Sequence, residues 1–478
     1  MKPVTRTSLP EQGGTGQATA IASDPRWRDL FTPAMAPRAA LVVLGVWLNA
    51  ADALVTATIM PTLVRELGGA AYYGWAVAIY LTGGILAGAS SGQLSRRLGL
   101  RPAMILAALA YAAGCAVSAA APSIHVFLIG RVFQGLGGGW IVGFCYVAIS
   151  KVFPERLWGR MFGVLAGVWG VASVIGPAIG GAFANGGHWR GAFWLFAGQG
   201  VLFAIACGLL LSKVQPEDSR RPLAWRTLGL LAVAIAAIAA ADVAPGALAP
   251  AALLLSGIAL LAVAARVNRL PGERLLPADA ARPMTVAGAG YAMIFAMEVA
   301  TVVFNVYEAA ILQVAYGVTP LIAGYVVCVM AVGWTAAAFV VAGQPERRHG
   351  RLIVAGGGTI TAGVVLLALT LARAPILWPI VAGAMVGVGF GLCWSLITQR
   401  VLGALSAEDQ AIGAGAVPTL QLIGGAVGAA AAGAAANLVG LPLDFSVAHV
   451  QAVTPWLFGG FVPIAFLGWL AALRLARG

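Results

Sequence analysis

The chain alternates long apolar runs with short polar or basic segments over almost its whole length. Each run is about 20 residues long, which is enough for an α-helix to cross the hydrocarbon core of a bilayer. The pattern predicts fourteen transmembrane helices, and therefore an all-α polytopic membrane protein. The predicted spans are residues 39–63, 74–94, 102–120, 124–149, 160–184, 191–212, 226–243, 247–265, 285–314, 318–342, 351–372, 376–400, 411–438 and 454–473.

A basic motif recurs in the two halves of the chain. The segment GQLSRRLGLRP at Gly92–Pro102 shares a Gly, a Gln, two Arg and a second Gly, in the same order, with GQPERRHGR at Gly343–Arg351. We interpret each segment as a short loop after the second span of its half, and the repetition as an internal duplication. The sequence thus predicts a cytoplasmic tail, a six-helix bundle, a linker with two extra helices and a second six-helix bundle. The expected boundaries are 1–37, 38–212, 213–284 and 285–478.

The composition agrees with a membrane protein, since 60% of the residues are hydrophobic and only 10% are charged. The formal charge of +12 has a clear pattern. Of the 29 Lys and Arg residues, 25 fall on one side of the predicted spans and three on the other. Because basic loops stay in the cytoplasm, we expect both termini there, in a multi-pass protein of the inner (plasma) membrane. The charge is then a topology signal, and we expect no nucleic-acid partner.

Nothing in the sequence indicates catalysis or a bound metal. The five cysteines fall inside predicted spans without CxxC or other metal-ligand spacing, and the four histidines lie at span ends or in loops. A membrane enzyme would need a nucleophile–base pair or a metal cluster, and neither is visible. We therefore expect no cofactor and no enzymatic activity.

Four ionisable residues lie inside predicted spans: Asp52, Arg131, Glu298 and Glu308. Such a group costs roughly 3 kcal/mol at this depth on insertion scales, so it usually has a function. Asp52 and Glu298 lie at matching depths in the first span of each half, and Arg131 is close enough in depth to pair with Asp52. The alternatives are that the acids only bond neighbouring helices, and that Arg131 snorkels outward or bonds backbone carbonyls.

Several polar residues share a helical face with these carboxylates, at spacings of three, four or seven positions. Such stripes are typical of the wall of a watery cavity between two bundles, and aromatic residues on the same helices suit loose contacts with a substrate. The expected cavity residues are Asn49, Thr56, Gln134, Trp140, Tyr291, Asn305 and Glu308.

Five motifs, in order and at the expected depths, resemble those of the major facilitator superfamily, in particular its fourteen-span drug:proton antiporters. They are Asp52 with Pro61; Gly92, Arg97, Gly99 and Arg101; Arg131, Gln134, Gly135 and Gly137; Gly163, Gly176, Pro177, Gly180 and Gly181; and Trp189 with Arg190. The resemblance implies two pseudo-symmetric six-helix bundles with a two-helix hairpin between them, which transport by alternating access. It also implies gating roles for Gly92, Arg97, Gly99, Gly176 and Pro177.

One position departs from the family pattern. Arg96 stands where the loop motif usually carries an Asp that faces a helix N-terminus of the other half. The positive end of a helix dipole would repel an arginine there. We therefore expect a different cytoplasmic latch, between Arg96 or Arg97 and Glu346.

The resemblance and the intramembrane charges together predict a proton-coupled secondary exporter of amphipathic organic compounds. Burial disfavours the charged form of a carboxyl group, so a proton and a cationic substrate would compete for Asp52 and Glu298, with Arg131 tuning the release. The expected partners are small-molecule substrates, protons and the lipid bilayer, and we expect a monomer. The alternatives are the same fold moving a specific metabolite, siderophore or lipid, and a non-transporting membrane sensor.

Overall fold

The structure is a computed structural model. It describes residues 32–33, 35–211, 224–241, 244, 248–277, 280, 282–341, 344–405, 407–441 and 445–477. It describes the backbone only at residues 92, 93, 96, 150, 151, 155, 156, 158–160, 162, 163, 166 and 407–415. The predictions for the tail and for most of the link between the sixth and seventh spans lie outside these residues.

The described residues form helices and connecting turns, without a strand. The first bundle consists of α1 (Ala36–Leu67), the short η2 (Ala70–Tyr72), α2 (Tyr73–Leu98), α3 (Leu100–Ala119), α4 (Ile124–Val152), α5 (Glu155–Asn185) and α6 (Trp189–Leu210). Then come α7 (Trp225–Ala240) and α8 (Leu248–Val267). The second bundle consists of α9 (Val286–Tyr316), α10 (Pro320–Val341), α11 (Glu346–Thr370), α12 (Leu377–Gly403), α13 (Ala407–Leu438), α14 (Val447–Gly459) and α15 (Val462–Arg477).

Thirteen candidate spans in the described part of the chain are long and apolar enough to cross a membrane. The seventh predicted span, residues 226–243, corresponds to α7, which has 16 residues and a length of about 24 Å, short of a typical hydrocarbon core. The last span is 31 residues long and consists of α14 and α15, which meet at Gly460 and Phe461. The all-α polytopic fold that the apolar pattern predicts is therefore confirmed.

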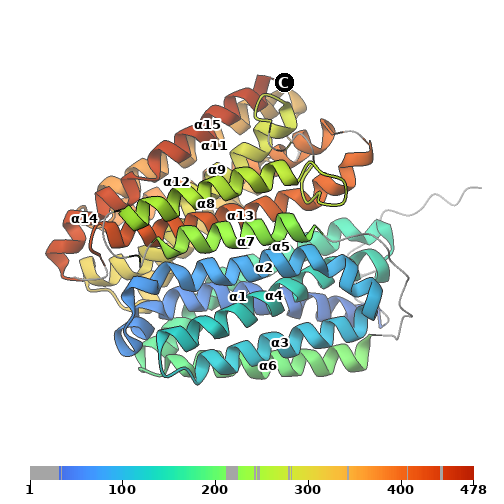
Figure 1. Cartoon of the computed structure of the whole chain (residues 1–478), viewed down its shortest axis with the longest axis horizontal. Coiled ribbons are helices and arrows are strands. Elements are labelled where there is room, and N and C mark those ends of the chain that lie inside the picture. Colours follow the sequence, from blue (N-terminus) through green and yellow to red (C-terminus); the bar gives the residue numbers. More distant parts are fainter. Residues whose placement is uncertain are drawn as a thin grey trace, which may run out of the picture.

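The two bundles repeat the same set of helix contacts. In the first, α1 packs on α5, α2 on α4, and α3 on both α4 and α6; in the second, α9 packs on α13, α10 on α12, and α11 on both α12 and α15. Figure 1 shows the two sets as separate layers, with the second diverging from the first toward the end where the C-terminus lies. The internal duplication seen in the basic motif thus extends to the packing of whole helices.

The bundles meet at one end through a contact that we call the seam. It consists of Ala71–Gly74 against Gly433–Asn437, and of Gly181 against Leu321. The Asn437 amide donates a hydrogen bond to the Ala71 carbonyl at 3.0 Å. A Cβ added to Gly74 would lie 2.8 Å from the Cα of Gly433, so only glycine lets α2 and α13 approach this closely. Because α2 and α10 begin at the seam while α5 and α13 end there, the seam closes one face of the molecule.

The helical hairpin of α7 and α8 lies beside the line where the bundles meet. Helix α7 contacts α2 of the first bundle and α13 of the second, whereas α8 packs chiefly on α7 (Figure 1). The Glu273 carboxylate accepts hydrogen bonds from the backbone amides of Arg226 and Thr227, at 3.0 and 3.2 Å, and so caps the start of α7. Most of α8 is exposed and apolar, as expected for a lipid-facing helix.

The expected loop at Gly92–Pro102 is wrong in extent. Helix α2 continues to Leu98 and α3 begins at Leu100, so Gly99 alone joins them. Residues 93–98 are mostly good helix formers, which extends α2 beyond the apolar run. Gly99 has a φ of +81°, a backbone conformation that glycine adopts without strain, and the chain reverses there. Arg96 therefore belongs to the last turns of α2 rather than to a loop.

Candidate functional site

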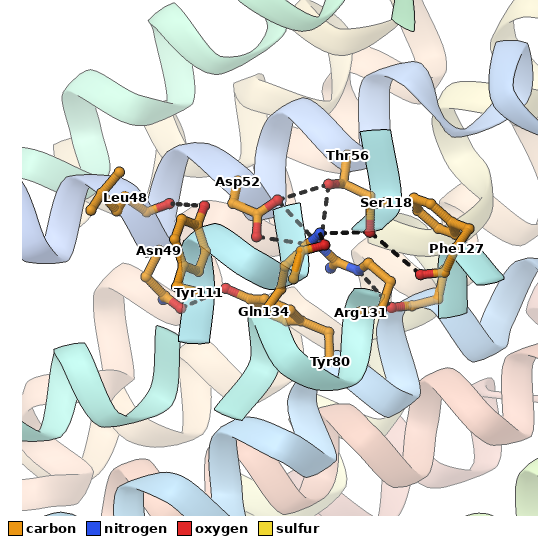
Figure 2. A network of polar contacts seen from close by, with 12 residues as sticks. Leu48, Asn49, Asp52, Thr56, Tyr80, Tyr111, Ser118, Phe127, Arg131 and Gln134 are labelled. Atoms are coloured by element: carbon orange, nitrogen blue, oxygen red, sulfur yellow. Dashed lines mark hydrogen bonds and ion pairs between the residues drawn. The ribbon is translucent and has the colours of Figure 1, made fainter. Parts of the chain in front are cut away.

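A buried ion pair lies at the centre of the first bundle. Nη1 of Arg131 on α4 is 3.2 and 3.3 Å from the two carboxylate oxygens of Asp52 on α1. The side chains are 2% and 0% exposed. Asp52 is near the middle of α1, so the pair lies at mid-span. Figure 2 shows the two side chains pointing toward each other. The expected partnership of Arg131 with Asp52 is confirmed.

The Arg131 guanidinium also reaches two further helices, α2 directly and α3 through Gln134. Its Nε donates to the Ala76 carbonyl of α2 at 3.1 Å, and its Cζ lies 4.1 Å above the centre of the Tyr80 ring. Its Nη1 donates to Gln134 Oε1 at 2.6 Å. The Gln134 amide nitrogen in turn donates to the Gly114 carbonyl and the Ser118 hydroxyl of α3, at 3.1 and 2.7 Å. One charged network therefore joins all four helices α1 to α4 (Figure 2).

The glycines around Arg131 allow this network to form. A Cβ on Gly135 would lie 2.2 Å from the Tyr80 carbonyl oxygen, and one on Gly137 would lie 2.4 Å from the Tyr111 backbone nitrogen. The motif LIGRVFQGLGGG therefore places Arg131 and Gln134, one helical turn apart, on a helix that α2 and α3 can approach to backbone distance.

Three of the expected cavity residues belong to this network or adjoin it. Thr56 donates to Asp52 Oδ1 at 3.1 Å and is buried, as is Gln134. Asn49 is only partly buried, and its amide oxygen accepts from the Tyr80 hydroxyl at 2.6 Å. We expected these side chains on an open wall. In this conformation Thr56 and Gln134 instead point into the first bundle, because Arg131 draws the nearby acceptors toward itself.

The carboxylates of the second bundle are arranged differently. Glu298 on α9 is half-buried beside Gln421 of α13, its hydrogen-bonding neighbour, and no charged group of the described chain acts on it. A Cβ on Gly424 would lie 2.9 Å from Glu298 Cβ, so glycine again permits the close approach. Glu298 is the 13th residue of α9, whereas Asp52 is the 17th of α1, and among the described residues Glu298 has no counterpart of Arg131. Nothing in the sequence pointed to Gln421.

The remaining residues of the α9 stripe differ in exposure. Tyr291 is 1% exposed, whereas Asn305, two turns beyond Glu298, is exposed although both of its sequence neighbours are buried. Glu308 is buried, and its Oε1 has no hydrogen-bond partner among the described residues. Of the polar residues that the sequence places on this face of α9, Asn305 is therefore the exposed one, and Tyr291 and Glu308 are buried.

An aromatic cluster on the second bundle was only partly anticipated. Trp334 of α10 stacks on Phe390 of α12, with ring centres 4.9 Å apart, and Trp394 completes the group at 5.5 Å from Trp334. Both tryptophans are half-buried. Trp140 of the first bundle, expected on the cavity wall, is also half-buried and donates to the Ser90 hydroxyl at 2.8 Å. Phe390 and Trp394 lie one turn apart on α12, and only the folded chain brings Trp334 of α10 against them.

A second ionic cluster joins the ends of α1 and α6. Glu66 accepts a hydrogen bond from the Trp189 indole nitrogen at 2.6 Å and forms an ion pair with Arg190. Arg190 stacks over the Trp189 ring and donates to the Ala121 carbonyl at 3.0 Å. Glu66 was missed by the sequence reasoning. Its position in the last turn of a helix, where a negative charge is disfavoured by the dipole, is the signal that called for a cationic partner.

The sequence model of one protein family, the Major Facilitator Superfamily, matches residues 42–429, which is most of the chain. The protein belongs to this superfamily. A "probable multidrug-efflux transporter" of Mycobacterium tuberculosis is 29% identical over 430 residues, which is 86% of this chain and 89% of that protein. An MFS-type transporter of the acurin A biosynthesis cluster in Aspergillus aculeatus is 32% identical over 199 residues, 40% of this chain and 36% of the relative.

Solved structures of the superfamily share the fold. A D-xylose–proton symporter superposes with a TM-score of 0.64 at 16% identity, covering 92% of this chain and 96% of the other. A bacterial homologue of the lysosomal transporter Spinster, in an inward-facing and unoccupied conformation, gives a TM-score of 0.63 at 15% identity, with 93% and 97% covered. At these identities the likeness concerns the architecture alone.

The superfamily motifs expected to act as gates lie in two places. Gly176 and Pro177 are where α5 meets the other helices: a Cβ on Gly176 would lie 2.8 Å from Leu54 of α1, and Pro177 lies against Gly324 of α10. Arg97 is exposed at the end of α2, beside Gly99, and Glu346 is exposed at the start of α11. No ion pair joins Arg97 to Glu346 among the described side chains. Of Gly92 and Arg96 only the backbone is described.

The described residues of this superfamily member contain no group of three His, Cys, Asp or Glu side chains that could hold a metal ion. The five cysteines are free and buried. The ionisable groups of the spans are instead arranged as one charge pair in the first bundle and two unpaired carboxyl groups on α9.

Proposed function

We propose that the protein is a proton-coupled exporter, which exchanges protons for amphipathic organic compounds by alternating access. The observation that carries this proposal is the mid-span Asp52, held by Arg131 in a network of four helices. A charged group is expensive at this depth, and this pair is supported by polar contacts well beyond what two packed helices require. The name of the mycobacterial relative supports multidrug efflux as the activity.

The pair can act as a switch because its charges balance only while Arg131 and Asp52 stay together. A proton on Asp52 removes the electrostatic attraction between Asp52 and Arg131. Arg131 then keeps only its other acceptors, Gln134 and the Ala76 carbonyl. Since these acceptors lie on α4 and α2, loss of the Asp52 bond would loosen α1 from its neighbours. The two bundles could then rock about the seam, which is the usual motion of this architecture.

Transport by the purified protein in liposomes tests this function. We expect a cationic dye to accumulate inside liposomes whose interior is more acidic than the medium, because protons leave as the dye enters. Accumulation should stop when an ionophore removes the pH gradient. A panel of dyes, a siderophore, a sugar and a lipid separates efflux of amphipathic compounds from transport of one metabolite. Transport that ignores the pH gradient would contradict proton coupling, and no transport of any compound would favour a sensor.

We propose that Glu298 selects for substrate charge, because it is the half-buried carboxyl of α9 without a cationic partner. Two mid-span carboxyl groups can neutralise a divalent cation, whereas one can neutralise only a monovalent cation. Glu298→Gln should therefore reduce export of a divalent dye most, of a monovalent dye less and of a neutral dye least. Export of the three dyes by wild type, Glu298→Gln and the control Glu298→Asp is compared at matched expression. Equal losses in all three classes would contradict this role.

We propose that the seam faces the outside of the inner membrane and that both termini are cytoplasmic. Arg97 and Arg348 are exposed at the helix ends opposite the seam, where the basic residues gather. In a chain without native cysteines, a membrane-impermeant thiol reagent added to whole cells should label Arg65→Cys, near the seam, but not Arg97→Cys or Arg348→Cys. Rapid labelling of Arg97→Cys or Arg348→Cys from outside would reverse the orientation.

A further inference from the structure

Glu308 lies inside the contact between the bundles. It is eight residues from the end of α9 at Tyr316, and so about 12 Å below the seam end of that helix. Its side chain is 4% exposed, and its Oε1 has no hydrogen-bond partner among the described residues. A buried polar atom without a partner is uncommon in a folded protein and calls for an explanation.

The contacts on both sides of Glu308 cross from one bundle to the other. Its neighbour Tyr307 stacks on Tyr73 of α2, with ring centres 5.0 Å apart and planes 22° from parallel. Cys328 of α10 is close enough to Glu308 for the two to interact electrostatically, and its thiol donates to the Ser173 carbonyl of α5. Because Tyr73 and Ser173 belong to the first bundle, Glu308 lies beside contacts that exist only while the bundles are together here.

No cation compensates the Glu308 carboxyl group. The titratable group that interacts with it is the Cys328 thiol on α10, and the phenol next to it along α9 is that of Tyr307, which stacks on Tyr73 of α2. In the described part of the chain, no charged side chain from any helix packed on α9 acts on it. An isolated carboxylate in such surroundings is so unfavourable that the group takes up a proton instead. Asp52 differs, because it is equally buried but held by Arg131.

We propose that Glu308 is a gating proton site: the seam closes only over a neutral Glu308, which takes its proton from the seam side while the bundles are apart. This inference rests on the proposed alternating access but not on the identity of the substrate. In the closed state the proton is trapped beside Cys328, next to the Tyr73–Tyr307 contact between the bundles. The site therefore senses acidity on the seam side and is distinct from the Asp52–Arg131 pair, which lies within the first bundle alone.

Distances between spin labels across the seam test the proposal. The labels are placed at Arg65→Cys and Val447→Cys, two exposed positions at the seam ends of α1 and α14. The native cysteines are replaced by Ala, except Cys328→Ser, which keeps a donor for the Ser173 carbonyl. In otherwise wild-type protein, we expect the short distance to dominate at acidic pH and a longer one to gain population at alkaline pH. Glu308→Gln should hold the short distance at both pH values.

Two further variants make the result specific. Glu308→Met, which suits the apolar surroundings, should behave as Glu308→Gln does and replaces it if the amide impairs folding. Glu308→Asp should keep the pH dependence. A pH-dependent distance that persists in both Glu308→Gln and Glu308→Met, or that is absent from the wild type, overturns the proposal. Liposomes that transport without a pH gradient would contradict the antiport, while leaving this distance result intact.

Discussion

Asp52→Asn is expected to reduce proton-driven export to the level of empty liposomes. The amide keeps the size of the carboxyl group and a hydrogen-bond acceptor for Thr56, but it neither carries a charge nor exchanges a proton. Without that change of charge, Arg131 has no ionic partner in any step, and the pH gradient has nothing to act on at this site. The measurement is dye accumulation against its gradient by purified protein in liposomes.

The design of this experiment separates coupling from folding. Exchange of labelled for unlabelled neutral dye at equal pH on both sides needs binding and rocking but neither net proton movement nor a charge on Asp52, so Asp52→Asn should retain it. Asp52→Glu keeps the titrating group and should retain a measurable part of uphill export. If Asp52→Asn concentrates dye at the wild-type rate, Asp52 serves only to hold helices together. If it loses exchange as well, the pair is structural.

Arg131→Met is expected to destabilise the protein by about 3–5 kcal/mol, the cost typical of removing one member of a buried ion pair. Asp52 would be left buried without its cation, and the Ala76 carbonyl and Gln134 would each lose a donor. Thermal unfolding in detergent, followed by loss of the monodisperse peak, should show a clear fall in the midpoint. Yield in the membrane should fall with it.

The double variant Asp52→Asn/Arg131→Met is the informative control for this prediction. With both charges removed, no uncompensated charge remains, so its loss of stability should be smaller than the sum of the two single losses. Arg190→Met supplies a matched comparison, because the Arg190–Glu66 pair is partly exposed and should contribute far less. If the stability losses of the Asp52 and Arg131 variants add, the two charges do not stabilise each other, contrary to what their distance implies.

The sequence alone determined the architecture, because the bilayer limits which structures are possible. A span must satisfy its own backbone hydrogen bonds, so runs of apolar residues can only be helices, and their number and order follow from reading the chain. The same limit exposed the functional residues: charges at mid-span are costly enough that Asp52, Arg131, Glu298 and Glu308 stood out, and depth alone matched Arg131 with Asp52. The repeat at Gly92 and Gly343 gave the duplication.

Only the tertiary structure decided how side chains of different helices face one another. Periodicity places Thr56 and Gln134 on a face, but whether that face meets water or Arg131 depends on the rotation and packing of four helices. Asp52 and Glu298 were expected at matching depths, but only Asp52 has a cation beside it among the described residues, and depth along a span does not predict this difference. Glu308 differs again, since its burial comes from contacts between the two bundles. Such contacts join residues far apart in the chain, and no local pattern specifies them.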